Sequence, residues 1–396
     1  MSILAHRPFL RATVVNFFFF GSLNGFVLLP LHVQQLGGTP VEIGVVMGVY
    51  SAVGIVSQPL LGPWIDAVGR KPFMLFGVVV VLASALLAAV TTAIGWLALV
   101  RMLQGLGFSA FFVANFAYVI DLVPAAQRGW ALGIYGVSGL VSAALAPLLG
   151  EWIVRRFGFR ALFALCGLLA AVAGMLLLGL AEQRRDVGQP VRGAEWVRLS
   201  FGELLRLHMT VTFFFGLGSG TIGTFVPTFA EGLGVTTLAL FYTAYAGAAM
   251  GVRVLGGHLI DTLGRRAVIV PSMFAQAVAS AGLAALGLGG PGVGMPSPLV
   301  LLVTTGLIAG GAHGFLYPGL AALVTDHAAP VHRGAIVGVF SAVFLFGHAA
   351  GAFVFGGVVH AVGYGSMWGL LAALLLAGAG LSLRLTGDTS HPASAA

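Results

Sequence analysis

The chain has 396 residues, of which 59% are apolar and 8% charged, and its mean hydropathy is +1.02. A water-soluble protein of this length cannot bury so much apolar surface, so lipid must surround most of the chain. The single cysteine, Cys166, excludes a disulfide framework and a cysteine-based metal site within one chain. The net charge of +7 is spread over short loops without interleaved aromatic residues. We therefore expect a lipid bilayer as partner, no nucleic acid, no metal and no cofactor.

Apolar runs long enough to cross a bilayer as helices, about 20 residues each, follow one another along the whole chain. The runs are continuously apolar rather than alternating, which favours helices over the strands of a barrel. The first run is too long for a cleavable signal peptide, and a second span follows it. The expected spans are 9–31, 41–62, 73–93, 96–119, 130–152, 160–181, 208–230, 238–258, 267–289, 298–324, 334–356 and 364–384.

One long polar connection, residues 182–207, divides the chain into an N-terminal unit, residues 1–181, and a C-terminal unit, residues 208–396. If the N-terminus is cytoplasmic, almost all loop cations lie on the cytoplasmic side, and the exceptions are Arg155, Arg156 and Arg160. Cytoplasmic loops of membrane proteins carry such an excess of cations. We therefore predict a multi-pass protein of the cell (inner) membrane with both termini in the cytoplasm.

A polar motif between the second and third spans recurs 195 residues later, between the eighth and ninth spans. The first copy, residues 62–72, reads Gly-Pro-Trp-Ile-Asp-Ala-Val-Gly-Arg-Lys-Pro, and the second, residues 257–266, reads Gly-His-Leu-Ile-Asp-Thr-Leu-Gly-Arg-Arg. At an offset of 205, Asp121 matches Asp326, and the Gly/Pro-rich stretch 286–298 accounts for the extra ten residues. Two six-helix repeats of the same orientation are typical of transporters whose site lies between the halves.

With these features the chain resembles the major facilitator superfamily over essentially its whole length. The resemblance implies an all-α membrane protein with 12 transmembrane helices in two pseudo-symmetric six-helix bundles. The first loop matches the family's signature between helices two and three at Gly62, Asp66, Gly69, Arg70 and Lys71. The resemblance also implies that this aspartate and arginine form a gating charge cluster with an acid of helix four, Asp121, locking the outward-open state. The C-terminal counterparts are Asp261, Arg265 and Asp326. Simple anchoring of helix ends at the lipid headgroups is the alternative.

Two arginines lie within predicted spans. The segment from Arg101 to Gly105 resembles the family's helix-four motif, whose arginine has been linked to proton transfer. A charge at that depth costs about 2.5–3.5 kcal/mol on insertion scales, so Arg101 should face the bundle interior or a cavity. Arg253 is nearer a helix end, where its side chain can snorkel to the interface. A weaker match to the exporters' motif in span five has Ala146 and Glu151 where the family has glycines.

Candidate residues for a central cavity come from the middle of several spans. His313 and His348 are candidates for proton coupling, because an imidazole titrates near neutral pH. A buried histidine that only makes a helix contact is the alternative. The candidate substrate-binding residues are polar or aromatic, namely Asn24, Gln104, Tyr135, Tyr242, Tyr245 and Tyr317.

No aspartate or glutamate falls in the middle of a span, which favours a neutral or anionic, partly apolar substrate over an organic cation. We expect a monomeric secondary transporter that moves a small organic molecule by alternating access, exporting it against proton entry. Proton-linked uptake or facilitated diffusion of a small metabolite or organic anion remains the alternative. An intramembrane enzyme is disfavoured because no His-Glu-x-x-His motif or paired aspartates occur in the spans. An ATP-driven pump is disfavoured because no phosphate-binding glycine-rich loop is present.

Overall fold

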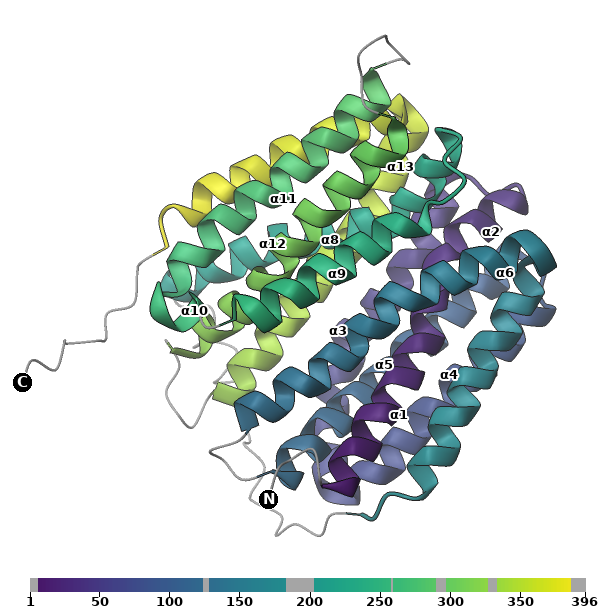
Figure 1. Ribbon diagram of the computed structural model, residues 1–396, viewed down its shortest axis with the longest axis vertical. Coiled ribbons are helices and arrows are strands. Elements are labelled where there is room, and N and C mark those ends of the chain that lie inside the picture. Colours follow the sequence, from purple (N-terminus) through teal and green to yellow (C-terminus); the bar gives the residue numbers. More distant parts are fainter. Residues whose placement is uncertain are drawn as a thin grey trace, which may run out of the picture.

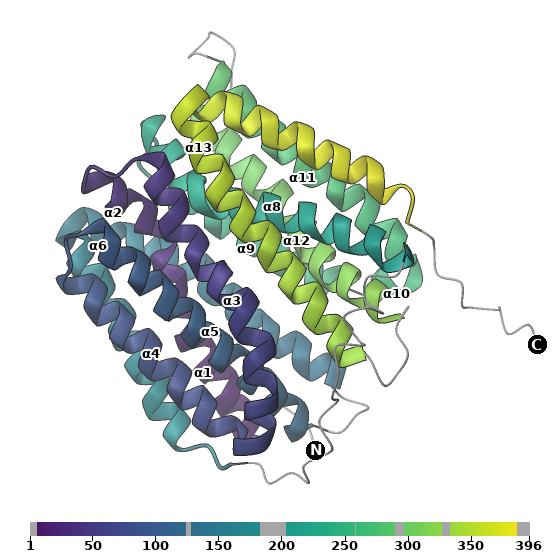
Figure 2. The same ribbon diagram turned by 180° about the vertical axis from the view of Figure 1, so that it is seen from behind.

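The structure is a computed structural model that describes residues 6–123, 128–182, 203–257, 259–289, 297–326 and 333–385. These residues form helices joined by short turns, with no β-strand among them. Figures 1 and 2 show two groups of helices lying side by side. The first group, called the N-lobe below, contains α1 to α6, and the second, the C-lobe, contains α8 to α13.

The N-lobe begins with α1 (Arg7–Asn24), which continues through the 3₁₀ turn η2 (Gly25–Leu28) into α2 (Leu29–Gln35). Its other helices are α3 (Pro40–Val68), α4 (Arg70–Val90), α5 (Ile94–Leu122) and α6 (Arg128–Leu178). The helices of the C-lobe are α8 (Glu203–Gly232), α9 (Ala239–Leu255), α10 (Leu259–Thr262), α11 (Arg265–Leu288), α12 (Pro298–Asp326) and α13 (Arg333–Ser382). Of the predicted linker, residues 183–202 lie outside the described residues, and α8 begins five residues before the predicted span.

Nine helical runs in the described residues are long and apolar enough to cross a membrane, with α1, η2 and α2 counted as one run. Two of these runs, α6 and α13, are each broken at a glycine with non-helical torsion angles. Figure 1 shows that α6 reverses direction, so it holds two of the predicted spans. The shorter apolar helix α9 has 17 residues. The observed helices are therefore consistent with twelve crossings and confirm the all-α membrane fold.

The backbone repeats the same unusual conformations in both lobes. Gly69 and Gly264, which precede α4 and α11, have φ of 120° and 88°. Gly158 and Gly363, which break α6 and α13, have φ of 81° and 79°. These pairs are separated by 195 and 205 residues, the two offsets found in the sequence. Positive φ values favour glycine because it lacks a Cβ. The duplication therefore extends from the sequence to the turns that set the helix directions.

Close helix contacts in the C-lobe depend on glycines, and several pairs of them, including Gly347 and Gly351, are four residues apart, a spacing typical of close helix packing in membranes. A Cβ on Gly347 of α13 would meet the carbonyl oxygen of Phe213 and would lie 2.9 Å from the backbone nitrogen of Leu217. Gly247 and Gly251 of α9 have the same spacing, but in the described state a Cβ at either position would meet nothing within 4 Å. Glycine spacing marks a helix face but does not show whether another helix covers it.

We expect Gly347→Ala to destabilise the protein by about 1–3 kcal/mol, because the new methyl group overlaps the backbone of α8. Gly369→Ala in the same helix is the matched control, since a Cβ there meets nothing within 4 Å. Alanine at that position should be neutral or stabilising by up to about 1 kcal/mol, because it favours the helix. Thermal melting of the purified variants measures both effects, and equal melting temperatures would refute the packing argument.

Candidate functional site

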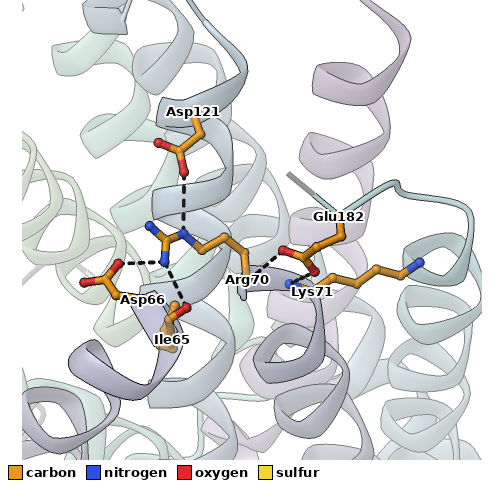
Figure 3. Close-up of polar contacts among 6 residues, drawn as sticks. All are labelled: Ile65, Asp66, Arg70, Lys71, Asp121 and Glu182. Atoms are coloured by element: carbon orange, nitrogen blue, oxygen red, sulfur yellow. Dashed lines mark hydrogen bonds and ion pairs between the residues drawn. The ribbon is translucent and has the colours of Figure 1, made fainter. Parts of the chain in front are cut away.

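The predicted charge cluster of the N-lobe is assembled around the buried guanidinium of Arg70 (Figure 3). Its Nη1 lies 2.6 Å from Oδ1 of Asp66, and its Nε lies 3.5 Å from Oδ2 of Asp121. Nη1 also donates to the carbonyl oxygen of Ile65 at 2.9 Å. The arginine therefore ties the end of α3 to the end of α5, and Gly69 provides the turn between α3 and α4. A Cβ on Gly62 would meet nothing within 4 Å, so packing gives no reason for that glycine.

Glu182 completes this cluster, although no sequence motif includes it. Its carboxylate accepts the backbone N–H groups of Arg70 at 2.9 Å and Lys71 at 3.0 Å, at the start of α4 (Figure 3). A carboxylate at this position satisfies amide donors that the helix itself leaves unpaired. Lys71 in turn donates from Nζ to the carbonyl oxygens of Leu178 and Leu180, at 3.0 and 2.6 Å. The end of α6 is thereby fixed to the start of α4.

The C-lobe repeats this arrangement. Arg265 Nε lies 3.2 Å from Oδ2 of Asp326, and its Nη1 donates to the carbonyl oxygen of Ile260 at 2.9 Å. Arg266 donates to the carbonyl oxygen of Leu383 at 2.8 Å, as Lys71 does to Leu178. The partners are displaced by the same 195 and 205 residues as the motifs. The side chain of Asp261, the predicted counterpart of Asp66, lies outside the described residues.

Arg101 is buried, as its depth in the membrane predicts. Its guanidinium carbon lies 4.2 Å from the ring centroid of Tyr50, and Nη1 donates to Oε1 of Gln104 at 2.8 Å. The first contact is a cation–π interaction, which partly replaces the lost hydration of the cation. Near it, Nδ1 of His348 lies 3.0 Å from the hydroxyl of Ser51, a hydrogen bond that joins the two lobes.

Three cavities lie between the lobes and share lining residues. The first, of about 210 Å³, is lined by Arg101, His348 and Asn24 among others. Asn24 also lines the second, of about 430 Å³, together with Tyr135, His313 and Tyr317. Tyr317 and Arg253 line both the second cavity and the third, of about 680 Å³. The shared lining residues show that these spaces are neighbours between the two lobes.

The structure thus brings most of the predicted cavity residues together, while three lie outside the lining of these cavities. Gln104 is fully buried and holds Arg101. Tyr242 is also buried, and its hydroxyl has no hydrogen-bond partner in the described residues. Tyr245 packs against His313, with 5.5 Å between ring centroids. No aspartate or glutamate is among the described residues that line the three cavities.

The lobes touch on the side away from the charge clusters, which is called the far side below. There Glu151 of α6 accepts the backbone N–H groups of Leu238 and Ala239, at 3.2 and 2.8 Å, at the start of α9. The same carboxylate pairs with Arg155 at 2.6 Å. In the sequence Glu151 is only a departure from the exporter motif. In the fold its buried carboxylate links the two lobes.

Further contacts between α3 and α13 close the same side. A Cβ on Gly44 would meet the carbonyl oxygen of Ala352, and one on Gly356 would lie 2.6 Å from the carbonyl oxygen of Pro40. The largest of these three cavities, in contrast, reaches Gly257 and Ile260, next to the charge cluster of the C-lobe. The site is therefore closed at the far side and extends toward the side of the charge clusters.

Two lobes of membrane-spanning helices with a cavity between them are the architecture of a membrane transporter. The comparison with known sequences agrees, because residues 10–296 and 209–396 match the Major Facilitator Superfamily. The chain belongs to this family, and it is a multi-pass membrane protein.

Individual relatives include exporters, and the fold matches those of solved transporters. The chain is 25% identical over 401 residues to the staphylopine export protein of Staphylococcus aureus, covering 98% of each chain. It is 25% identical over 261 residues to the multi-drug resistance efflux pump PmrA of Streptococcus pneumoniae, covering 62% of this chain and 65% of PmrA. The crystal structure of a point mutant of the nucleoside transporter NupG superimposes with a TM-score of 0.82 at 17% identity, covering 96% of this chain and 99% of NupG. The last likeness concerns the fold alone.

Proposed function

We propose that this transporter exports a small neutral or anionic organic molecule in exchange for protons, by alternating access between the two lobes. The observation that carries the proposal is the cavity between the lobes, which is lined by Arg253, His313 and aromatic residues but by no described carboxylate. An organic cation would find no described counter-charge there. The export direction draws on the two relatives that are named as an export protein and an efflux pump.

Proton coupling is assigned to Arg101, His313 and His348. His313 Nδ1 is buried without a hydrogen-bond partner among the described residues, and it lies at the cavity wall. His348 forms the hydrogen bond to Ser51 across the lobes. Protonation of the imidazole at either position would change a contact at the site or at the lobe interface. Transport and proton movement would then depend on the same residues.

The orientation that places the charge clusters in the cytoplasm makes the described state inward-facing. In that orientation the contacts of Glu151 close the outer side, and the largest cavity extends toward the cytoplasm. In this orientation both termini are cytoplasmic. The proposal also places the transporter in the cell (inner) membrane, where it works as a monomer. Proton-linked uptake or facilitated diffusion of a small metabolite is the second candidate function, which the same cavity also allows.

The proton gradient distinguishes these directions in purified protein reconstituted into vesicles. Three labelled probes with one ring system are offered, naphthalene-2-sulfonate, its neutral sulfonamide and the (2-naphthylmethyl)trimethylammonium cation. With an acidic lumen, protons leave the vesicle, so an antiporter accumulates the probe that it accepts. We expect accumulation under this gradient. Accumulation only with an acidic exterior supports symport, whereas equal rates under both gradients contradict proton coupling.

The charge cluster around Arg70 is proposed to act in gating, although its contacts lie within the N-lobe and are present in this inward-facing state, whereas the family resemblance implies that they lock the outward-open state. The carboxylate of Asp66 is 63% exposed, so water can replace Arg70 as its partner and this ion pair is broken and reformed at low cost. We expect Asp66→Lys to reduce flux of the accepted probe at least about tenfold, because the new cation repels Arg70, with normal membrane insertion. Glu231→Gln, at an exposed acid outside the cluster, is the control. Unchanged flux in Asp66→Lys leaves only an anchoring role for the cluster.

Alternating access also requires surfaces that are apart in this state and meet in the other. Thr243 of α9 donates to the carbonyl oxygen of Ala144 of α6 at 2.9 Å, on the far side. Gly247 and Gly251 follow one and two turns later, roughly on the same face, where a Cβ meets nothing within 4 Å. On α6, a Cβ on Gly133 would also meet nothing within 4 Å. We propose that these glycines allow α6 and α9 to close together when the cavity opens on the far side.

Substituting Gly251 with leucine tests this closure. In the described state a Cβ at this position meets nothing within 4 Å, so the melting temperature should stay close to that of the wild-type protein. The closed arrangement of α6 and α9 lacks that space, so flux of the accepted probe should fall about tenfold or more. Gly369→Leu places the same side chain in open space away from the lobe interface and serves as the control. Wild-type flux in Gly251→Leu contradicts the proposed movement.

A further inference from the structure

We infer that Arg253 is the anion-binding residue of the central cavity, and that the substrate is an amphipathic organic anion. Its anionic group would bind to the C-lobe at Arg253, and its apolar body would lie on aromatic rings of the N-lobe. This inference rests on the proposed transport function and specifies its substrate class.

The guanidinium of Arg253 has no counter-charge within the described residues. Its Nε is buried and has no hydrogen-bond partner there. None of the ion pairs of the described residues includes Arg253, whereas Arg70, Arg155 and Arg265 all have a carboxylate within 4.0 Å. A cation removed from water without a partner is costly, and the cost is offset when an anion binds. The other arginine of the cavities, Arg101, also has a buried Nε without a partner in the described residues, but its guanidinium is engaged by Tyr50 and Gln104.

Arg253 turns toward the cavity rather than toward the membrane surface. Leu255, two residues later in α9, is 75% exposed and is not among the residues that line the described cavities. Arg253 instead lines the two larger cavities. A Cβ on Gly136 of α6, across the lobe boundary, would lie 3.8 Å from its Nη1. A snorkelling arginine would lie on the exposed face, so this position indicates a role in the cavity.

Groups beside Arg253 can supplement its binding of an anion. His313 and Tyr317 line the same cavity, and their ring centroids are 6.5 Å apart. Nδ1 of His313 is buried without a partner in the described residues. The phenol of Tyr317 can donate a hydrogen bond, and so can an imidazole N–H. A guanidinium with two neighbouring donors suits a carboxylate, sulfonate or phosphate group.

The opposite wall of the cavity is a row of aromatic rings on α5. Phe108 and Phe112 are stacked with 5.2 Å between centroids, and Phe116 follows at 6.0 Å from Phe112. Tyr135 of α6 extends the row at 6.4 Å from Phe116. Such a surface binds flat or apolar groups by burial and ring stacking. The cavity of about 430 Å³ lies within the usual range for a small organic ligand.

Because the cation belongs to the C-lobe and the rings belong to the N-lobe, one amphipathic anion contacts both lobes at once. A ligand shifts a conformational equilibrium only through contacts that differ between the states. The contacts of the bound anion depend on the relative position of the two lobes. Binding of the anion can therefore shift the equilibrium between the positions of the lobes. A purely apolar molecule would leave Arg253 unpaired.

Ligand-induced thermal stabilisation of the purified full-length protein tests the inference. The probes are naphthalene-2-sulfonate, its neutral sulfonamide and the (2-naphthylmethyl)trimethylammonium cation, which share one ring system. We expect a saturable rise in melting temperature with the sulfonate, and at least about tenfold weaker apparent affinity for the other two. Arg253→Gln should weaken sulfonate binding at least about tenfold, while Arg253→Lys, which keeps the charge, should retain part of it. Arg156→Gln, at an exposed arginine far from the cavities, should bind like the wild-type protein.

Arg253→Gln without ligand should melt at or above the wild-type temperature, because it removes an unpaired buried cation. A marked loss of stability would indicate a structural role and overturn the assignment. Equal or tighter binding of the sulfonamide or the ammonium probe, no saturable effect of the sulfonate, or full sulfonate binding by Arg253→Gln would each overturn it as well. Preference for the ammonium probe would also contradict the proposed substrate class, whereas the other results concern the anion site alone. The proton-gradient experiment tests coupling and direction separately, with whichever probe is accepted. Failure of the anion site is therefore distinguishable from failure of the proposed function.

Discussion

A charge or backbone group within the bilayer must find its partner inside the protein, and this constraint explains the placement of the polar residues. Arg70 and Arg265, at the helix turns, each have a carboxylate and a backbone carbonyl as partners. Arg101, deeper in the bundle, is held by a ring and an amide. Arg253 lacks such a partner in the described residues but faces a cavity. We infer that a bound ligand supplies the partner that this cation lacks.

The same turn, with the same contacts, occurs in both lobes. Each lobe places a glycine of positive φ before a basic pair, and the first arginine of that pair binds the carbonyl five residues before it. The second basic residue binds the end of the last helix of its own lobe. Such contacts fix the helices within a lobe and do not cross the boundary between the lobes. This division makes each lobe a unit that can move as a whole.

The sequence predicted the fold and the charge clusters well, because both depend on local patterns. Long apolar runs define the helices, and the motif spacing places Asp66 and Arg70 one helical turn apart. The partners that it missed, Glu151 and Glu182, come from distant segments and belong to no motif. The sequence also did not show which side of each helix faces the cavity, because a helix in lipid is apolar on all sides and has no amphipathic stripe. Tyr242 was therefore a candidate for the cavity although the structure buries it elsewhere.

The far-side contacts join the two lobes, whereas the charge clusters join helices within one lobe. The far-side contacts must therefore break when the lobes separate on that side. Glu151 binds two backbone amides of the other lobe while keeping Arg155 as a partner in its own. If the lobes part on that side, the carboxylate still has its arginine, and water can reach the freed amides of α9. The glycine contacts of α3 and α13 lose only van der Waals packing. Opening the far side therefore leaves no charge unpaired in lipid, so the contacts that close the site are ones that can be broken repeatedly.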